Sequence, residues 1–377
     1  MAWPIEIETD LWEYLSQTKK NIVLYGMGNG ADKILDVCER KGIRISGVFA
    51  SDDFVRGQSF RGMKVQTFAQ IRKQFPLPDL IVLVAFATKI PSVMENIFRI
   101  ESECELYVPD VPAFGDTLFT RSFFTENREA VQKAYECFAD KDSRLVYENI
   151  LFFKLTGKLQ YLRAADRIPD PISPLFVKNC RSAYIDLGAY TGDTLASFRQ
   201  NNKLSQMIAF EPDRRSFKKL LSSLENTEKS RPWMAVEAGA WSAPGTLSFH
   251  AEGNRNSSLG TGKDSIPVDT VDHILHLDPG HCPEYCHFSD GYRTPDSVDW
   301  IKYDVEGSET EALEGSRKTI ERFRPNLSVS IYHKSEDIFR IPLYIHENYP
   351  DYSLFIRKEP YIPSWEIRLL AQNGNQP

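Results

Sequence analysis

The chain has 377 residues, of which 42% are apolar and 26% are charged. These values are near the average for soluble globular proteins, so they exclude a wholly disordered or fibrous chain. At about 100–200 residues per domain, the length predicts two domains. The 52 acidic residues outnumber the 45 basic ones, which gives a formal net charge of -7. Such a chain lacks the positive field with which proteins bind nucleic acid, so nucleic acid is disfavoured as a partner.

The sequence also predicts a protein without a membrane anchor. Its longest uninterrupted apolar run, residues 80–87, is far shorter than the roughly 20 residues that cross a bilayer as a helix. The first residues show no basic start followed by an apolar stretch, so we expect no secretory signal. Six scattered cysteines are typical of reduced thiols. Together these features predict a cytoplasmic location.

The first half of the chain opens with an apolar strand, Ile22–Tyr25, followed by a glycine-rich turn. Gly26, Gly28 and Ala31 satisfy the fingerprint G-x-G-x-x-[G/A] of dinucleotide-binding turns, and Asp52 follows at a suitable distance. Residues 31–41, 43–49 and 80–87 continue an alternating helix and strand pattern. We therefore expect a Rossmann-like domain over residues 1–119. It binds a nucleotide or nucleotide-sugar, or it is a structural or dimerising domain.

A helical connector is expected over residues 120–175. Apolar residues recur at helical intervals between Thr125 and Arg163, which predicts two helices joined around residues 139–143. Pro169, Pro171 and Pro174 then interrupt helix formation and mark the start of a domain over residues 176–377. A homodimer could form through the amino-terminal domain or the connector.

The second domain again alternates strands and helices, so the predicted fold class is α/β in both domains. A helix beginning at Ser308 has capping-box spacing to Glu311, and residues 251–295 are expected to form a loop over the site. The strands are expected at residues 183–187, 207–210, 234–238, 298–303, 327–332, 352–356 and 365–369.

A second glycine turn carries the clearest chemistry. Asp186 ends a strand, Gly188 and Gly192 complete D-x-G-x-x-x-G, and Glu211 ends the next strand. Ligands of open α/β sheets bind at the carboxyl ends of the strands, where Glu211 could accept hydrogen bonds from both ribose hydroxyls. The turn lacks the phosphate-binding G-x-x-x-x-G-K-[ST] sequence. S-adenosylmethionine fits such a pocket, with the turn around its amino-acid portion.

Several segments of the second domain resemble the FkbM family of S-adenosylmethionine-dependent methyltransferases. They are Tyr184–Asp193, Phe210–Pro212 and Trp300–Glu309, and residues 266–272 and 330–337 also resemble family segments. The resemblance covers residues 176–372. It implies a class I methyltransferase fold and methyl transfer to a hydroxyl of a small molecule, a sugar or a glycan precursor. The cofactor site that it implies comprises Asp186, Gly188, Ala189, Tyr190, Thr191, Gly192, Glu211, Ala240 and Trp241.

Three further residues are candidates for catalysis. His333, Asp304 and Glu306 each follow a predicted strand, so we expect them to project at the cofactor edge. An alcohol is a poor nucleophile and benefits from a base, and histidine has a suitable ordinary pKa. We expect His333 to act as base or acceptor-orienting group, with Asp304 and Glu306 positioning cofactor and acceptor. The alternative is that His333 caps a helix or binds a carbonyl.

Other functions stay open at this point. The first glycine turn would suit an NAD(P)-dependent sugar-modifying oxidoreductase, and a non-catalytic scaffold with two nucleotide folds is a third possibility. No resident metal is expected, although Asp269, Asp272 and Asp304 together could bind a divalent ion. The aromatic residues of the polar loop, Tyr285, Phe288 and Tyr292, are candidates for contacting an acceptor sugar.

Overall fold

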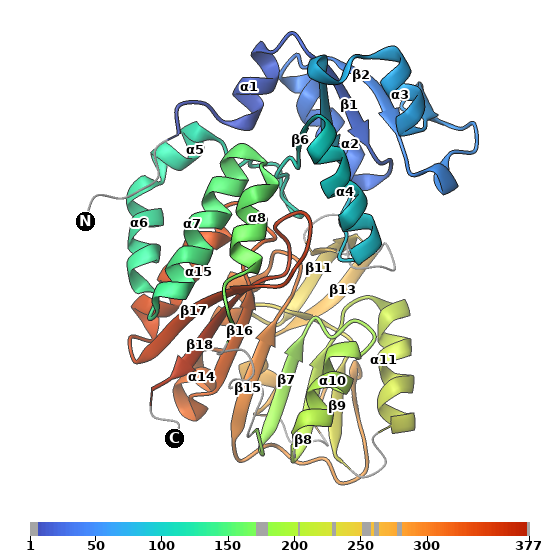
Figure 1. Ribbon diagram of the computed structural model, residues 1–377. Coiled ribbons are helices and arrows are strands. Elements are labelled where there is room, and N and C mark those ends of the chain that lie inside the picture. Colours follow the sequence, from blue (N-terminus) through green and yellow to red (C-terminus); the bar gives the residue numbers. More distant parts are fainter. Residues whose placement is uncertain are drawn as a thin grey trace.

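The computed structural model describes residues 7–170, 180–202, 204–227, 231–250, 258–259, 264–276 and 281–374. An amino-terminal α/β unit lies at the top of Figure 1, a layer of helices lies at the left, and a large sheet lies below them. Both α/β units contain mainly parallel, Rossmann-like sheets, which confirms the predicted fold class. Among the described residues, no helix combines the length and the apolar character needed to cross a membrane.

The amino-terminal sheet has the order β3-β4-β2-β1-β5-β6 and is parallel except for the β3–β4 hairpin. Every residue of β5, with the sequence LIVLV, is buried, as expected of a strand covered on both faces. The elements are α1 (Leu11–Gln17), β1 (Asn21–Tyr25), α2 (Asn29–Arg40), β2 (Ile45–Phe49), β3 (Ser59–Phe60), β4 (Met63–Gln66), α3 (Phe68–Gln74), β5 (Leu80–Val84), α4 (Pro91–Glu103) and β6 (Glu105–Tyr107).

Close internal packing accounts for two glycines of the first turn. A Cβ on Gly26 would lie 2.5 Å from the ring of Phe86, and one on Gly30 would lie 2.6 Å from the carbonyl oxygen of Ala85. Asp52 lies in an exposed 3-10 turn, Asp52–Phe54. These glycines are therefore required by the fold itself, and nucleotide binding at this turn stays a prediction.

The connector contains the two expected helices, α6 (Arg128–Cys137) and α7 (Lys141–Thr156), flanked by α5 (Arg121–Glu126) and α8 (Leu159–Asp166). The side chain of Asp140 accepts a hydrogen bond from the Ser143 backbone at 2.6 Å and caps α7. In Figure 1 these helices lie over the red end of the large sheet. Their apolar side chains share one core with that sheet, so the connector is a covering layer of the second α/β unit.

The large sheet has the order β14-β9-β8-β7-β15-β16-β18-β17. Strands β9 to β16 of this order are parallel, whereas β18 is antiparallel to both of its neighbours and β14 is antiparallel to β9. Its strands are β7 (Ala183–Leu187), β8 (Gln206–Phe210), β9 (Trp233–Val236), β14 (Cys286–Phe288), β15 (Val298–Tyr303), β16 (Asn326–Ser330), β17 (Tyr352–Lys358) and β18 (Ile367–Asn373). All seven predicted strands are present; β7 and β15 have the predicted ends, and the other five have shifted ends.

The order of the sheet creates a ligand-binding edge. The chain runs outward from β7 through β8 to β9 and then returns to the other side of β7 as β15. Where the winding reverses, the carboxyl ends of adjacent parallel strands open a crevice. The accompanying helices are α10 (Asp193–Asn201), α11 (Arg214–Thr227), α12 (Val271–Ile274), α13 (Glu309–Glu314), α14 (Arg317–Phe323) and α15 (Asp337–Asn348).

The prediction of a loop over residues 251–295 is wrong for the part of this range that the structure describes. Strand β13 (Asp264–Asp269) joins β10 (Gly239–Ala240), β11 (Gly245–His250) and β12 (Ser258–Leu259) in a small sheet, and β14 forms the edge of the large one. The polar composition of this region did not predict these short strands, because backbone pairing holds them and a continuous apolar run is absent. Residues 251–257, 260–263 and 277–280 of the expected loop lie outside the described residues.

The helix expected from Ser308 onward is in fact two helices, and the expected capping box is absent. The Ser308 side chain makes no capping hydrogen bond. Between α13 and α14, a Cβ on Gly315 would lie 2.0 Å from the carbonyl oxygen of Trp241. The Asp272 carboxylate accepts hydrogen bonds from the backbones of Lys318 and Thr319, both at 2.8 Å, and so caps α14 separately. The side chain of Asp272, which is distant in the sequence, therefore stabilises the start of α14 and with it the break between α13 and α14.

Candidate active site

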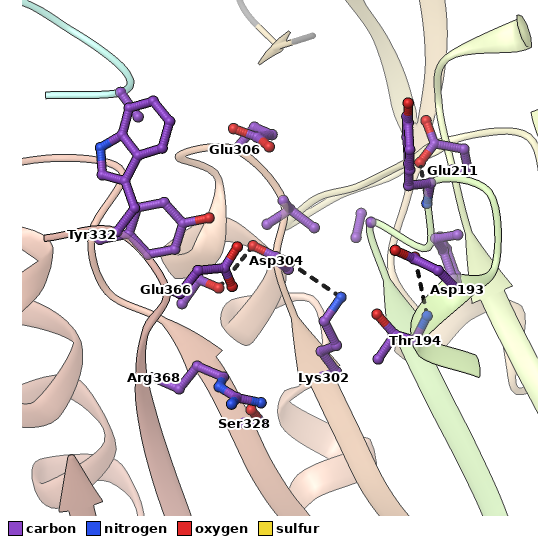
Figure 2. Close-up of a pocket in the computed structure, with 18 of the residues that line it drawn as sticks. Asp193, Thr194, Glu211, Lys302, Asp304, Glu306, Ser328, Tyr332, Glu366 and Arg368 are labelled. Carbon is purple, nitrogen blue, oxygen red and sulfur yellow. Dashed lines mark hydrogen bonds and ion pairs between the residues drawn. The ribbon is translucent and has the colours of Figure 1, made fainter. Parts of the chain in front are cut away.

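A cavity of about 460 Å³ lies at the carboxyl ends of β7, β8, β15 and β16. Gly188, Glu211, Asp304 and Ser330, which end or follow these four strands, all line it. Figure 2 shows Glu211 and Asp193 on one side of this cavity, Tyr332 and Glu366 on the other, and Asp304 between them. The cavity therefore has two sides that can hold different ligands.

The turn after β7 requires glycine for two reasons. Gly188 has a φ of +81°, and a Cβ there would lie only 1.9 Å from the carbonyl oxygen of Asp304. The backbone N–H of Asp304 also donates to the carbonyl of Leu187 at 3.0 Å. The turn and the end of β15 are thus pressed together. This close approach leaves a surface of bare backbone for a ligand.

Glu211 is buried at the end of β8 and faces the same turn. One carboxylate oxygen accepts from the Tyr190 backbone at 2.7 Å, and the other accepts from the Asp213 backbone at 2.8 Å. Burial raises the pKa of Glu211 to about 8, against the opposite effect of these two N–H groups. The carboxyl group is therefore fixed in position and retains lone pairs that can accept hydroxyl groups.

Lys302 links the two acids at the ends of β7 and β15. Its Nζ lies 3.2 Å from Asp186 Oδ1 and 3.3 Å from Asp304 Oδ2, and Figure 2 shows the contact with Asp304. Burial opposes the charge of Lys302, but the two carboxylates outweigh it and raise the pKa of the lysine. Burial raises the pKa of Asp186, whereas Lys302 and His333 overcome burial and lower the pKa of Asp304. Asp304 is therefore an ionised carboxylate at the cavity.

His333 lies behind this acidic loop and does not line the cavity. Its side chain is fully buried, with Nδ1 2.8 Å from Glu309 Oε1 and Nε2 3.4 Å from Glu306 Oε2. Burial opposes its charge, but the neighbouring carboxylates raise the pKa of His333 to about 10. An imidazolium at neutral pH has no free lone pair to accept a proton. The geometry therefore favours a positioning role over the expected role as base.

Some residues of the expected cofactor site line the cavity, and others do not. Gly188, Tyr190, Glu211 and Ala240 line the cavity. Asp186, Ala189 and Gly192 are buried beneath it, and Thr191 and Trp241 are not among the lining residues. Of the catalytic candidates, Asp304 and Glu306 line the cavity.

Several lining residues were missed by sequence reasoning. Asp193 and Thr194 begin α10 directly after the glycine turn, so their position in the sequence was a usable signal. Lys302 and Ser328 lie within strands and point to the cavity because of strand alternation. Lys89 and Ala113 come from the amino-terminal half, which the sequence did not connect with this site.

The remaining candidates serve the fold. Within the described ranges, no group of three or more His, Cys, Asp or Glu side chains could hold a metal ion. Asp272 caps α14, and Asp269 accepts a hydrogen bond from the Tyr285 hydroxyl at 2.6 Å. Phe288 and Tyr292 stack on each other at the β14 edge, and no member of this aromatic group lines the cavity. The cavity lining gives no support to their contact with an acceptor sugar, which stays a prediction.

The segment between β6 and α5 closes one side of the site. The Phe114 backbone N–H donates to the carbonyl of His333 at 2.8 Å. The Phe114 ring covers Gly307, where a Cβ would lie 2.9 Å from ring atoms. Thr88 and Ile362 exchange two backbone hydrogen bonds of 2.7 and 2.9 Å. The amino-terminal half is therefore built into the wall of the cavity.

The parallel sheet, the close glycine turn and the acid after the next strand define an α/β fold of the methyltransferase type. Residues 186–352 match the family model described as methyltransferase FkbM domain. The second half of the chain therefore contains an FkbM methyltransferase domain. No curated protein sequence matches the chain.

One similar solved structure, itself a methyltransferase FkbM, has the same fold. The methyltransferase FkbM of Methylobacillus flagellatus KT is similar over 93% of this chain and 90% of that chain, with a TM-score of 0.66 and 21% identity. An rRNA methylase of Streptococcus thermophilus matches 55% of this chain and 98% of its own, with a TM-score of 0.34 and 13% identity. Aeropyrum pernix fibrillarin with bound S-adenosyl-L-methionine matches 52% of this chain and 67% of its own, with a TM-score of 0.31 and 12% identity.

Proposed function

We propose that this protein transfers a methyl group from S-adenosylmethionine to a hydroxyl of a small molecule, a sugar or a glycan precursor. The observation that carries the proposal is the pairing of the Gly188 turn with buried Glu211 at the ends of adjacent strands of an FkbM domain. We place the reaction in the cytoplasm, and the carboxylates of the cavity disfavour a nucleic-acid substrate.

The residues present fit the cofactor. Gly188 leaves backbone uncovered, Glu211 offers carboxyl oxygens to a ribose, and Ala240 is small enough to lie against adenine. The ionised carboxylate of Asp304 at the cavity also suits a positively charged ligand. When bound, the cofactor supplies a methyl group whose bond to sulfur breaks as its bond to the acceptor oxygen forms.

The side chains of the protein then act on the acceptor. Because Lys302 and His333 keep Asp304 ionised, its carboxylate can accept the hydrogen bond of the acceptor hydroxyl, orient it and receive its proton. Glu306 lines the cavity beside it and would hold a second acceptor group. His333 fixes both acids through its charge. Positioning supplies much of the rate in such a displacement.

Calorimetric titration with S-adenosylmethionine tests the cofactor assignment. Glu211→Ala removes the acceptor of the ribose hydroxyls. Each of the two hydrogen bonds to a ribose hydroxyl contributes about 0.5–1.5 kcal/mol, so we expect binding to weaken about 5-fold to 100-fold. Glu211→Gln keeps most of the side-chain volume and should bind better than the alanine variant. Glu225→Ala, on the exposed side of α11, is the matched control and should bind as the wild type does. Undetectable binding to the wild-type protein would contradict the proposal.

A further inference from the structure

Three aromatic side chains form a band on the side of the cavity away from Glu211. Tyr332 follows β16, and Tyr361 and Trp365 lie in the β17–β18 hairpin; all three line the cavity. The ring centroids of Tyr332 and Trp365 are 6.4 Å apart with an interplanar angle of 26°, and those of Tyr361 and Trp365 are 6.1 Å apart at 23°. We call these three residues the aromatic band.

The geometry of the aromatic band suits a flat apolar face. Rings that enclose an ammonium group stand around it, and each directs its negative face inward. Here successive rings are inclined by only 23–26°, which gives a shallow surface. The C–H face of a pyranose ring packs on such a surface, as apolar area packs on aromatic rings in general. The band therefore favours a sugar over a quaternary amine.

Carboxylates accompany the aromatic band. Glu306, Glu359 and Glu366 line the same cavity as Asp304. Arg368 contacts Glu359, so part of its charge is compensated within the protein. Hydroxyl groups of a sugar can donate to these carboxylates. Lys89 also lines the cavity, but with Asp304 the carboxylates outnumber it and Arg368, so a uronate or a phosphate would meet a net negative charge. This chemistry selects a neutral acceptor.

The position of the aromatic band relative to the cofactor side is suitable for transfer. In Figure 2, Tyr332 and Glu366 lie on one side of Asp304, and Glu211, Asp193 and Thr194 lie on the other. A sugar on the band would therefore present a hydroxyl towards Asp304. The Thr88–Ile362 backbone pair fixes the hairpin that carries Tyr361 and Trp365.

We propose that the aromatic band is the acceptor subsite, that it binds a neutral pyranose ring, and that Trp365 is its main specificity-determining residue. This assignment rests on the proposed function and names the acceptor class for the same cavity.

Saturation-transfer NMR with simple glycosides tests the subsite. The probes are methyl β-D-glucopyranoside, -galactopyranoside and -mannopyranoside, with methyl β-D-glucuronide and choline as charged comparisons. We expect at least one neutral glycoside to bind, and the glucuronide to bind at least about tenfold more weakly. Trp365→Ala should weaken binding of the neutral glycoside about tenfold or more, and Trp365→Phe should restore part of it. Phe288→Ala, at the β14 edge, is the aromatic control and should leave glycoside binding unchanged.

A separate titration with S-adenosylhomocysteine distinguishes the two proposals. We expect Trp365→Ala to bind this product within twofold of the wild type. If the wild-type protein binds S-adenosylhomocysteine but no neutral glycoside, or binds choline in preference, the subsite assignment is overturned. The same holds if Trp365→Ala leaves glycoside binding unchanged. Failure of S-adenosylhomocysteine to bind would instead contradict the proposed function.

Discussion

His333 illustrates how one buried charge organises several acidic residues. Its ring lies among Glu309, Glu306 and Asp304 at 2.8, 3.4 and 3.8 Å. Removing the positive partner of such a group leaves buried negative charge without compensation, which costs about 3–5 kcal/mol. The residue is therefore important for the stability of the acidic loop, whatever the acceptor is.

The stability of the protein should depend on pH through this residue. The pKa of His333 in the folded state is about 10, above its ordinary value of 6.5. The contribution of charged His333 to the free energy of unfolding is thus complete below pH 6.5. It decreases as the pH rises above this value and is lost once the pH has passed 10. We expect His333→Gln to be less stable than the wild type by about 3–5 kcal/mol at pH 6, with a difference that shrinks towards pH 10.5.

Denaturant unfolding at a series of pH values measures this difference. His346→Gln is the control, because His346 is exposed on α15. A difference between wild type and His333→Gln that stays constant from pH 6 to 10.5 would show that the histidine is not charged in the folded state.

Single residues were predictable where a motif fixes their place along the chain. Gly188 and Glu211 follow strands at characteristic positions, and both line the cavity. The burial of His333 was not predictable, since it depends on Glu309 turning back from α13 to contact the ring. Lys302 was overlooked because its two partners come from different strands, β7 and β15.

At the scale of elements, the close approach of the β7 turn to β15 leads to a sharp prediction. Gly188→Ala combines an unfavourable φ of +81° with a Cβ placed 1.9 Å from a carbonyl oxygen. Gly62→Ala is a matched control, because Gly62 has a φ of +79° and no atom within 4 Å of its added Cβ. We expect the control to lose about 1 kcal/mol through the backbone conformation, and Gly188→Ala to lose a further 1–3 kcal/mol, approximately, through steric overlap.

Thermal unfolding and cofactor titration measure the two effects of Gly188→Ala. Gly62→Ala should keep its affinity for S-adenosylmethionine, whereas Gly188→Ala should lose most of it. Equal losses of stability in the two variants would contradict the steric argument.

Elements were predictable in proportion to the apolar area that they bury. The fully buried strands β7 and β8 were recognised from continuous apolar runs. The edge strand β14 was not, because its last residue, Phe288, is exposed and its pairing is carried by the backbone. The break between α13 and α14 depends on Asp272, which is distant in the sequence.

At the scale of the whole molecule, Asp110 joins three parts of the chain. Its carboxylate contacts Lys154 of α7 at 3.0 Å and accepts from the Ser364 hydroxyl of the hairpin at 3.0 Å. Both charged side chains are buried, with 3% and 6% of their surface exposed. Asp110 therefore ties the end of the amino-terminal half to α7 and to the β17–β18 hairpin.

Removing this acid should destabilise the whole protein. Asp110→Ala leaves the Lys154 charge buried, and we expect a loss of about 3–5 kcal/mol in denaturant unfolding. The double variant Asp110→Leu with Lys154→Met removes both charges and should recover part of that loss. Glu129→Ala, which breaks the exposed Lys133 pair, should change stability little. A second unfolding transition that is unaffected by Asp110→Ala would show that the two halves fold independently.

The Thr88–Ile362 backbone pair has a consequence for the evolution of the enzyme. It fastens a loop of the first α/β unit to the hairpin that carries Tyr361 and Trp365, while the Gly188 turn and Glu211 belong to other segments. Under the proposed assignment, insertions or exchanges in the hairpin and in the facing loop alter which acceptor is accepted and leave methyl-donor binding intact. The acceptor side and the methyl-donor side of the cavity would then change independently of each other.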